Sequence, residues 1–595
     1  MTARPSAEPF FFGPPERPLF GWLHRSAAPA ASLGLVICAP FGYEEICAHR
    51  SLAAFADAAA EAGFPAIRFD ADGTGNAAGE PTDPGRLAAW VASAGHAADT
   101  LRAATGVERV VFLGVRLGVI TAALAAARDD VAGLVAIAPV VNAKAHLREL
   151  RALQMSGTPR PPPPDVAVDP TVQPVLGFPI TAETKASLET IDLAKREKPP
   201  APAVLILDRD DLPTTTAWPE HLAAQGVAVE RQVLPGFVEM TLGAEFAVPP
   251  RAMIDATVTW LRARVASAAT RATTPPALAH EARVTPEVVE RIVRVGGVDS
   301  GPGMFGVLAT PAHAPPRRRG LLLLNAGAVH HVGPNRLHVT LARRWAARGH
   351  AVLRLDVSGI GDSPARAGHG ENVVYGASAV QDVDDAQAFL RREPGVAEVH
   401  GLGICSGGYH AFKAAVAGVR LDGVVSINPL TFFFKAEVPK EERAHQVSSE
   451  TSRYFRRLRD VEAWKKLFRG DVKVGAFART LMRRAEHLAG DRARGVARVF
   501  GVSVGDDLGA ELQTIARHKV ALRFLFAAGD PGEELLAAGG GPTVGELQKR
   551  GALSVDVIAG PDHTFTPLWS HGVLAARLGA WFDAPVDGSR GEGGA

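Results

Sequence analysis

The sequence predicts an α/β protein made of two tandem domains, each with a mostly parallel, doubly wound sheet. The chain has 595 residues, which is too long for one ordinary core and fits about two large domains. Short apolar runs alternate with helix-length segments, a pattern typical of parallel sheets covered by helices on both faces. The same succession of motifs occurs once in each half, so we expect two copies of one architecture.

Each copy begins with an apolar strand that runs into a turn. Leu33 to Ala39 leads into Pro-Phe-Gly in the first half, and Leu321 to Leu324 leads into Asn-Ala-Gly in the second. A helix-length segment and a short strand follow in both halves. Each strand then ends in an Asp-x-x-Gly-x-Gly turn, at 70–75 and at 356–361.

The later parts of the two halves also match in kind and order. Amphipathic helices are predicted next, followed by a strand with a glycine-flanked turn and then by two more strands. In the order first half and second half, these segments are 87–104 and 379–393, 110–118 and 398–407, 134–139 and 424–429, and 204–210 and 522–530.

Composition and turn residues set the expected boundaries. Residues 266–286 lack periodicity and carry turn formers, which indicates a linker between the domains. Insertions that follow the carboxyl ends of strands usually cover a ligand crevice, and the second half has a helix-rich one. We therefore expect a first domain at 1–265, a linker at 266–286, a second domain at 287–585 with a helical cap at about 431–515, and a disordered tail at 586–595.

Charge and hydropathy exclude several functional classes. The 64 Lys and Arg residues nearly balance the 63 Asp and Glu residues, so no global basic field favours nucleic acid as a partner. No apolar run reaches the about 18 residues of a membrane span, and the first residues lack the apolar core of a signal peptide. We expect a cytoplasmic protein with no membrane partner. Its three cysteines suit a reducing compartment, and Cys38 and Cys47 are expected to be packing residues.

Cys405 stands where a buried strand turns sharply into a helix. Gly403 and Gly407 lie two residues before and two residues after it. Glycines at these places allow the close backbone contacts of a tight turn that exposes its central residue. Ser406 is one step out of register, so its side chain should leave the turn in another direction. We expect the sulfur atom of Cys405 to be the nucleophile.

With this elbow, the Asp-x-x-Gly-x-Gly turn and the strand order, both halves resemble the α/β-hydrolase superfamily over nearly the whole chain. Within it, they are similar to serine-aminopeptidase-like esterases and acyl hydrolases, including those that accompany acyl-carrier-protein systems. Residues 403–408, Gly-Ile-Cys-Ser-Gly-Gly, also resemble more loosely the elbow of polyhydroxyalkanoate synthases and dienelactone hydrolases.

The resemblance implies a triad in the order nucleophile, acid, histidine. The acid should then follow the seventh strand and the histidine the eighth. Asp530 and His563 stand at these places. Glu533 lies one turn beyond Asp530 and could serve as the acid instead. Asp382, Asp506 or the absence of an acid are the remaining alternatives.

The chemistry of a thiol supports this set of residues independently. A helix N-terminus and a neighbouring imidazole both favour the thiolate, and an acid behind His563 would hold its tautomer. The oxyanion of an acyl-transfer reaction needs two backbone donors. The superfamily pattern implies the amide of Ser406 and one from the loop after the third strand, Ala326 or Gly327.

Other residues near the expected site have less defined roles. Phe432, at the start of the cap, suggests an apolar acyl pocket. His330 and His331 follow the oxyanion loop and could contact substrate, or they could be structural. They are not expected to bind a metal, because adjacent residues rarely point together and no acidic or cysteine partner lies nearby in the sequence. Asp356 and Asp362 are interpreted as turn formers that brace the strand end. No metal or cofactor is expected.

The first half departs from the triad pattern. Arg116 stands where the nucleophile should be, and the turn at 235–240 has no histidine. Since a guanidinium cannot attack a carbonyl, this half should be unable to perform triad catalysis. Arg116 could bind an anion, such as a phosphopantetheine or carboxylate, or could pair with Asp210 as a structural brace. The brace is the preferred interpretation.

The sequence thus predicts an acyl-transfer enzyme that acts on a small-molecule ester or thioester. Water as the second nucleophile would make it a hydrolase or thioesterase, whereas an alcohol or amine would make it an acyltransferase. An acyl carrier protein could deliver the substrate, and the first half could dock it. The competing hypothesis is a non-catalytic binding or scaffold protein with an inert Cys405, because fold alone does not prove activity.

Overall fold

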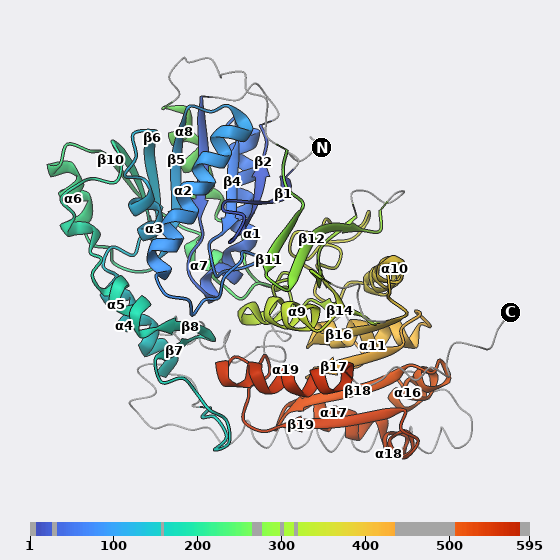
Figure 1. Ribbon diagram of the computed structural model, residues 1–595. Coiled ribbons are helices and arrows are strands. Elements are labelled where there is room, and N and C mark those ends of the chain that lie inside the picture. Colours follow the sequence, from blue (N-terminus) through green and yellow to red (C-terminus); the bar gives the residue numbers. More distant parts are fainter. Residues whose placement is uncertain are drawn as a thin grey trace.

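Two α/β domains form around two separate sheets, as the fold class predicted from the sequence requires. The computed structural model describes residues 7–26, 32–155, 160–264, 277–297, 303–313, 319–434 and 506–583. Figure 1 shows the two sheets side by side, with β1 and β2 of the first domain facing the β11 and β12 edge of the second. The predicted α/β class with mostly parallel sheets is confirmed.

The first sheet has eight strands in the order β1-β2-β4-β3-β5-β6-β9-β10. β2 is antiparallel to both of its neighbours, and the strands from β4 to β10 are parallel. The central strands are apolar throughout because helices cover both faces. Their bounds are β1 (Ala7–Phe12), β2 (Leu19–His24), β3 (Leu33–Cys38), β4 (Ala66–Asp70), β5 (Arg109–Val115), β6 (Val131–Ile137), β9 (Ala203–Arg209) and β10 (Ala228–Leu234).

Helices cover both faces of this sheet. α2 (Arg86–Thr105) and α3 (Gly118–Ala125) pack on one face, and α1 (Tyr43–Glu61) and α8 (Arg251–Arg262) on the other. α2 ends where Gly106 takes a left-handed conformation that stops the helix. The remaining elements are α4 (Ala143–Met155), β7 (Val172–Val175), β8 (Phe178–Thr181), α5 (Ala182–Glu189), η1 (Leu193–Lys195), α6 (Ala217–Ala224) and α7 (Phe237–Met240).

The second sheet repeats the first and adds one edge strand. Its order is β11-β12-β13-β15-β14-β16-β17-β18-β19, with β13 antiparallel to both neighbours as β2 is in the first sheet. The additional strand is β11. The bounds are β11 (Glu281–Thr285), β12 (Val288–Val295), β13 (Met304–Pro311), β14 (Arg319–Leu324), β15 (Ala351–Leu355), β16 (Glu398–Ile404), β17 (Gly423–Ile427), β18 (Ala521–Ala527) and β19 (Leu553–Ile558).

The helices of the second domain also form two layers. α10 (Ala379–Arg392), α11 (Ser406–Val416), α16 (Leu508–Arg517) and α18 (Pro542–Lys549) share one core with the sheet, and α9 (Leu337–Ala347) and α19 (Leu568–Phe582) share the other. α17 (Pro531–Gly540) packs against α16, and η2 (Pro334–Arg336) precedes α9. None of the described helices is long and apolar enough to cross a bilayer.

The structure refines two of the expected boundaries. The last residues of the expected linker form β11, because 281–285 pairs in antiparallel fashion with β12. Most of the expected cap, 435–505, lies outside the described residues, as does the tail from 584. The end of the expected cap belongs to α16, which packs against α11 and α18 in the body of the domain.

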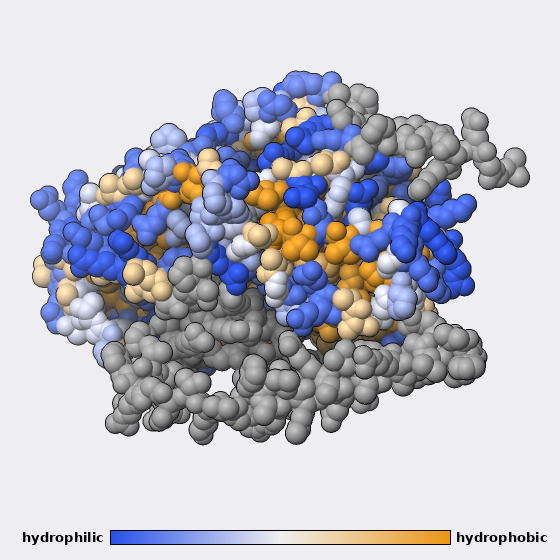
Figure 2. Space-filling model, turned by 90° about the horizontal axis from the view of Figure 1, so that it is seen from below, coloured by the Kyte–Doolittle hydropathy of each residue, from blue (hydrophilic) through white to orange (hydrophobic). Residues whose placement is uncertain are grey.

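An apolar core joins the two domains. Phe20 and Trp22 of β2 pack against Phe305 of β13, with ring centroids 6.3 and 4.9 Å from the Phe305 ring. Phe11 of β1 donates its amide to the carbonyl of Ala279, 2.7 Å away, just before β11. The corresponding strands of the two domains therefore face each other. Viewed from below, hydrophobic residues gather near the middle of the molecule, with hydrophilic residues around them (Figure 2).

Candidate active site

Cys405 occupies a strained turn between β16 and α11. Its φ of 57° and ψ of −116° are rare for a residue with a side chain. A Cβ atom on Gly403 would collide with the backbone of Gly407, and one on Gly407 would lie 2.7 Å from the carbonyl oxygen of Leu324. The glycines on both sides of Cys405 are thus required by close backbone contacts.

The first domain builds the same turn around Arg116. Its φ is 51°, and its amide donates to the carbonyl of Ile137 as the amide of Cys405 donates to Ile427, at 3.0 and 2.8 Å. A Cβ atom on Gly114 would lie 2.5 Å from the Cα of Val119. The repeat seen in the sequence therefore reflects one backbone geometry, and only the side chain at its tip differs.

His563 and Asp530 meet at the carboxyl end of the second sheet. His563 lies in the turn after β19 and donates from Nδ1 to Oδ2 of Asp530, 2.7 Å away. Asp530 caps α17, where its Oδ1 accepts the amide of Gly532 at 2.9 Å. The carboxylate is 6% exposed. The helix start therefore fixes the acid, and the acid fixes the tautomer of the imidazole.

His563 is held in its charged form by its two neighbours. Burial disfavours the imidazolium, but the hydrogen bond to Asp530 and the nearby thiol of Cys405 outweigh burial and raise the pKa of His563 to about 10. Its Nε2 is buried and has no hydrogen-bond partner of ordinary geometry among the described residues. Since Nδ1 is engaged with Asp530, Nε2 is the nitrogen that can exchange a proton with Cys405.

Of the candidate acids, Asp530 is the one that contacts His563. Asp382 accepts the amide and hydroxyl of Ser358 at 3.0 and 2.8 Å and pairs with Arg366 at 2.7 Å, so it braces a loop. Asp506 is exposed, and Glu533 follows within the first turn of α17. The geometry separates alternatives that the spacing in the sequence left open.

The order of strands and the place of the elbow decide the fold. In each domain, the chain order maps onto a sheet whose second strand is antiparallel and whose later strands are parallel, with the elbow before the helix that follows the central strand β5 or β16. In the second domain, the acid and histidine follow the last two strands. Both domains have the α/β-hydrolase fold.

No protein-family model and no curated protein sequence matches the chain. Similar solved structures include ferulic-acid-bound Est1E from Butyrivibrio proteoclasticus, with 16% identity, a TM-score of 0.33, and coverage of 43% of this chain and 98% of that one. An a/b serine hydrolase without lid from Xanthomonas campestris has 15% identity and a TM-score of 0.29 over 44% and 97% of the two chains. A proline iminopeptidase from Mycobacterium smegmatis has 16% identity and a TM-score of 0.30 over 44% and 98%.

The oxyanion loop of the second domain offers two amides. The amide of Gly327 donates to Oγ of Ser406 at 2.9 Å, so a side chain already engages it. No hydrogen bond of the Ala326 amide occurs within the described residues. The amide of Ser406 is at the first position of α11 and has no acceptor in the preceding turn. Ala326 and Ser406, rather than Gly327, are therefore the available pair of donors.

Asn428 positions His563 and was not identified from the sequence. It is fully buried, with a φ of 46°. Its Nδ2 donates to the carbonyl of His563 at 2.7 Å, and its Oδ1 accepts the amide of Ala527 at 2.8 Å. The side chain thus ties the histidine turn to β18. A signal existed, because the repeat has Ser-Ile-Asn-Pro here and Ala-Ile-Ala-Pro in the first half.

Tyr375 is a second residue that the sequence reasoning missed. Burial, the thiol of Cys405 and then the charge of Glu245 raise the pKa of Tyr375 well above its usual range. Its ring stacks on Phe434 at 4.4 Å and meets Tyr409 edge-on at 5.1 Å. An aromatic cluster therefore lies beside Cys405. Tyr375 comes from a loop without a motif, so no sequence pattern indicates it.

Phe432 is part of the core, which differs from its expected role in an acyl pocket. It is 5% exposed and packs against Phe412 of α11 and Phe524 of β18, with ring centroids 5.3 and 5.8 Å away. The position directly after β17 places it under the helix layer. Phe434, two residues further on, reaches Tyr375 instead.

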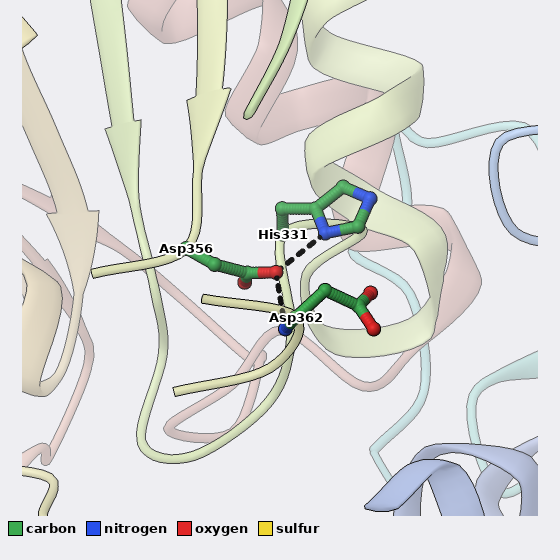
Figure 3. A group of neighbouring side chains, drawn as sticks. All are labelled: His331, Asp356 and Asp362. Carbon is green, nitrogen blue, oxygen red and sulfur yellow. Dashed lines mark hydrogen bonds and ion pairs between the residues drawn. The ribbon is translucent and has the colours of Figure 1, made fainter. Parts of the chain in front are cut away.

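His330 and His331 are buried between the domains, so the structure does not place them at the expected substrate site. His330 stacks on His49 of α1 with ring centroids 3.9 Å apart. His331 donates from Nδ1 to Oδ2 of Asp356 at 2.8 Å (Figure 3), and its Nε2 lies 3.1 Å from Oδ1 of Asn76. An acidic partner does lie nearby, which the sequence spacing did not reveal, because the turn at 356–361 folds back onto this loop.

The ligand atoms of His331, Asp356 and Asp362 lie within 4.8 Å of one another, as in a metal site. Figure 3 shows, however, that Asp356 bonds to His331 and also accepts the amide of Asp362, at 3.0 Å. Asp362 pairs with Arg68 of the first domain at 2.6 Å. Burial alone would raise the pKa of Asp362, but Arg68 and His49 hold it well below its usual range. The protein itself supplies the positive charge, so this cluster fits an interdomain brace better than a metal centre.

Arg116 is a brace in the first domain, but with other partners than expected. It pairs with Glu44 of α1 and Glu149 of α4, both at 3.0 Å, and Asp210 is exposed. Burial lowers the pKa of Arg116, and the two carboxylates outweigh this effect and raise it. The guanidinium thus joins the elbow to α1 and α4, since these helices bring acids to the tip of the turn.

Proposed function

We propose that the second domain catalyses acyl transfer through a covalent acyl-cysteine. The thiolate of Cys405 attacks the carbonyl carbon of an ester or thioester, and His563 gives a proton to the departing alcohol or thiol. Water, an alcohol or an amine then attacks the acyl-cysteine while His563 takes its proton. The hydrogen bond between His563 and Asp530, placed beside an elbow cysteine, is the observation that carries this proposal.

The surroundings of Cys405 favour each step. The start of α11 and the positive charge of His563 both stabilise a thiolate. The amides of Ala326 and Ser406 can donate to the oxyanion that forms on the carbonyl oxygen. A thiolate exchanges readily with thioesters, which favours acyl thioesters, including those bound to a carrier protein, as substrates.

The first domain is proposed to bind or position rather than to catalyse. Arg116 replaces the nucleophile, and its guanidinium is engaged by Glu44 and Glu149. No histidine follows β10 in the turn at 235–240. The fold is retained there because the elbow glycines and the packing of α1 and α3 do not depend on a reactive side chain.

Intact-protein mass spectrometry after brief exposure to acyl thioesters and activated esters tests this proposal. Wild type should gain the mass of one acyl group, and Cys405→Ala should gain none. Cys47→Ala is the matched control and should behave as wild type, because Cys47 is buried and its burial raises its thiol pKa.

The lifetime of the adduct separates the reaction types. Rapid loss in water indicates a hydrolase, whereas loss only on addition of an amine or alcohol indicates a transferase. Absence of an adduct across the panel, together with alkylation of Cys405 at the rate of an ordinary thiol, would contradict the proposal. That result would favour a scaffold of hydrolase fold.

A further inference from the structure

Two segments of the first domain reach the site on the second. Nδ2 of Asn372 donates to the carbonyls of Ala244 and Glu245, at 3.2 and 3.0 Å, in the loop between α7 and α8. From another part of the first domain, Arg160 donates to the carbonyl of Pro561 at 3.1 Å, two residues before His563. The surroundings of the catalytic residues are therefore shared between the domains.

The side chain of Glu245 comes close to the oxyanion loop. A Cβ atom built on Gly327 would lie 3.8 Å from Oε2 of Glu245, and Gly327 is adjacent to Ala326. The charge of Glu245 also acts on Tyr375, which contacts Cys405. The carboxylate thus lies between the oxyanion loop and the aromatic residues beside the nucleophile.

A carboxylate at this place has a clear effect on the reaction. It would repel the negative charge that develops on the carbonyl oxygen, unless the substrate brings a positive charge to the same place. The rings of Tyr375, Tyr409 and Phe434 cluster next to it. Aromatic rings together with a carboxylate form a favourable environment for an ammonium group.

On the basis of the proposed function, we propose that Glu245 selects acyl substrates that carry a positively charged amino group close to the reacting carbonyl, such as aminoacyl thioesters. Glu245 is then a substrate-binding residue supplied by the domain that lacks a triad. This role explains why a domain without a nucleophile stays attached to one that has it.

Two matched thioesters test the selection. The N-acetylcysteamine thioesters of β-alanine and of butyrate have nearly the same shape, but the first ends in an ammonium group where the second ends in a methyl group. Wild type should have the higher kcat/KM for the β-alanyl thioester. Glu245→Gln should lower this value by at least about tenfold and leave the butyryl value within about twofold. Glu239→Gln, an exposed acid from the same segment, should change neither.

A second measurement needs no catalysis. Cys405 attacks the sulfenyl sulfur of a methanethiosulfonate, so that a mixed disulfide forms and methanesulfinate leaves. The ratio of rates for the cationic 2-aminoethyl reagent and the neutral methyl reagent reports the charge near Cys405. Glu245→Gln should lower this ratio several-fold and Glu239→Gln should not, with Cys405→Ala giving the background from other thiols.

The two measurements distinguish the failure of each proposal. If the thioesters are turned over but Glu245→Gln changes neither their relative kcat/KM nor the reagent ratio, the role of Glu245 is wrong and acyl transfer stands. If wild type turns over neither thioester and Glu245→Gln still lowers the reagent ratio, the charge selectivity at the site is supported and the acyl-transfer proposal fails for these substrates.

Discussion

Cys405 and His563 form a pair whose behaviour depends on the charge of the imidazole. The pKa of His563 in the fold, about 10, is above its ordinary value of about 6.5. Protonated His563 therefore stabilises the folded state fully below about pH 6.5, and this contribution is lost as the pH rises toward about 10. Across the neutral range, Cys405 thus has a cation beside it.

Alkylation of Cys405 by iodoacetamide should reflect this cation. In wild type, the rate should change little between about pH 7 and pH 9, because His563 stays protonated over this range. In His563→Ala, the rate should fall steeply as the pH drops below about 8.5, the usual range for a thiol. Mass-spectrometric counting of the modified cysteine measures both profiles. Identical profiles in the two proteins would show that His563 does not control the thiol.

At the scale of elements, the elbow is a backbone structure to which a reactive side chain is added. It recurs with Arg116 at its tip, so its stability does not depend on the nucleophile. What it does require is the absence of a Cβ atom at Gly403 and Gly407, where neighbouring backbone approaches too closely. The Asp530 cap of α17 and the Asn428 bridge to β18 then bring the other two catalytic groups to this fixed point.

Gly403→Ala should therefore lower the free energy of unfolding by about 3 kcal/mol or more, because the backbone of Gly407 cannot move away. Gly545→Ala in α18 is the matched control. No heavy atom lies within 4 Å of the added Cβ there, so alanine should be neutral or stabilise the helix by about 0.5–1 kcal/mol. Urea unfolding of both variants measures the difference, and equal midpoints would contradict the role of the elbow contacts.

At the scale of the whole molecule, the two domains are joined by a nearly symmetric polar interface. Arg68 of β4 donates to Asp362 at 2.6 Å, and Arg354 of β15 donates to Asn76 at 2.7 Å. Each arginine lies two residues before a turn aspartate, and each acceptor lies six residues after one. The two Asp-x-x-Gly-x-Gly turns thus hold each other. This arrangement also fixes the loop that carries Glu245 against the second domain.

Arg68→Met should cost about 3–5 kcal/mol of unfolding free energy, because it leaves Asp362 buried without its main cation. Arg577→Met is the control, since it breaks an exposed pair with Asp556 and should cost less than about 1 kcal/mol. Arg68 lies over the ring of Trp22, 4.7 Å from its centroid, so tryptophan fluorescence during urea unfolding reports this interface. Similar losses in the two variants would mean that the pair is not structurally important.

Local sequence determined the fold class and the three residues of the triad. A sharp strand-to-helix turn requires glycines at fixed offsets, and the alternation of strands and helices sets the order in which an acid and a histidine reach one sheet edge. Cys405, Asp530 and His563 could therefore be identified from the order of residues alone, and so could the loss of the nucleophile in the first half.

The tertiary structure alone decided the contacts between distant segments. The bond from Gly327 to Ser406, the Asn428 bridge, the pairing of His331 with Asp356 and the approach of Glu245 to the oxyanion loop have no local pattern. Each depends on how two separately formed units pack. Packing responds to the shape and charge of whole surfaces, and for this reason the spacing of residues along the chain does not specify it.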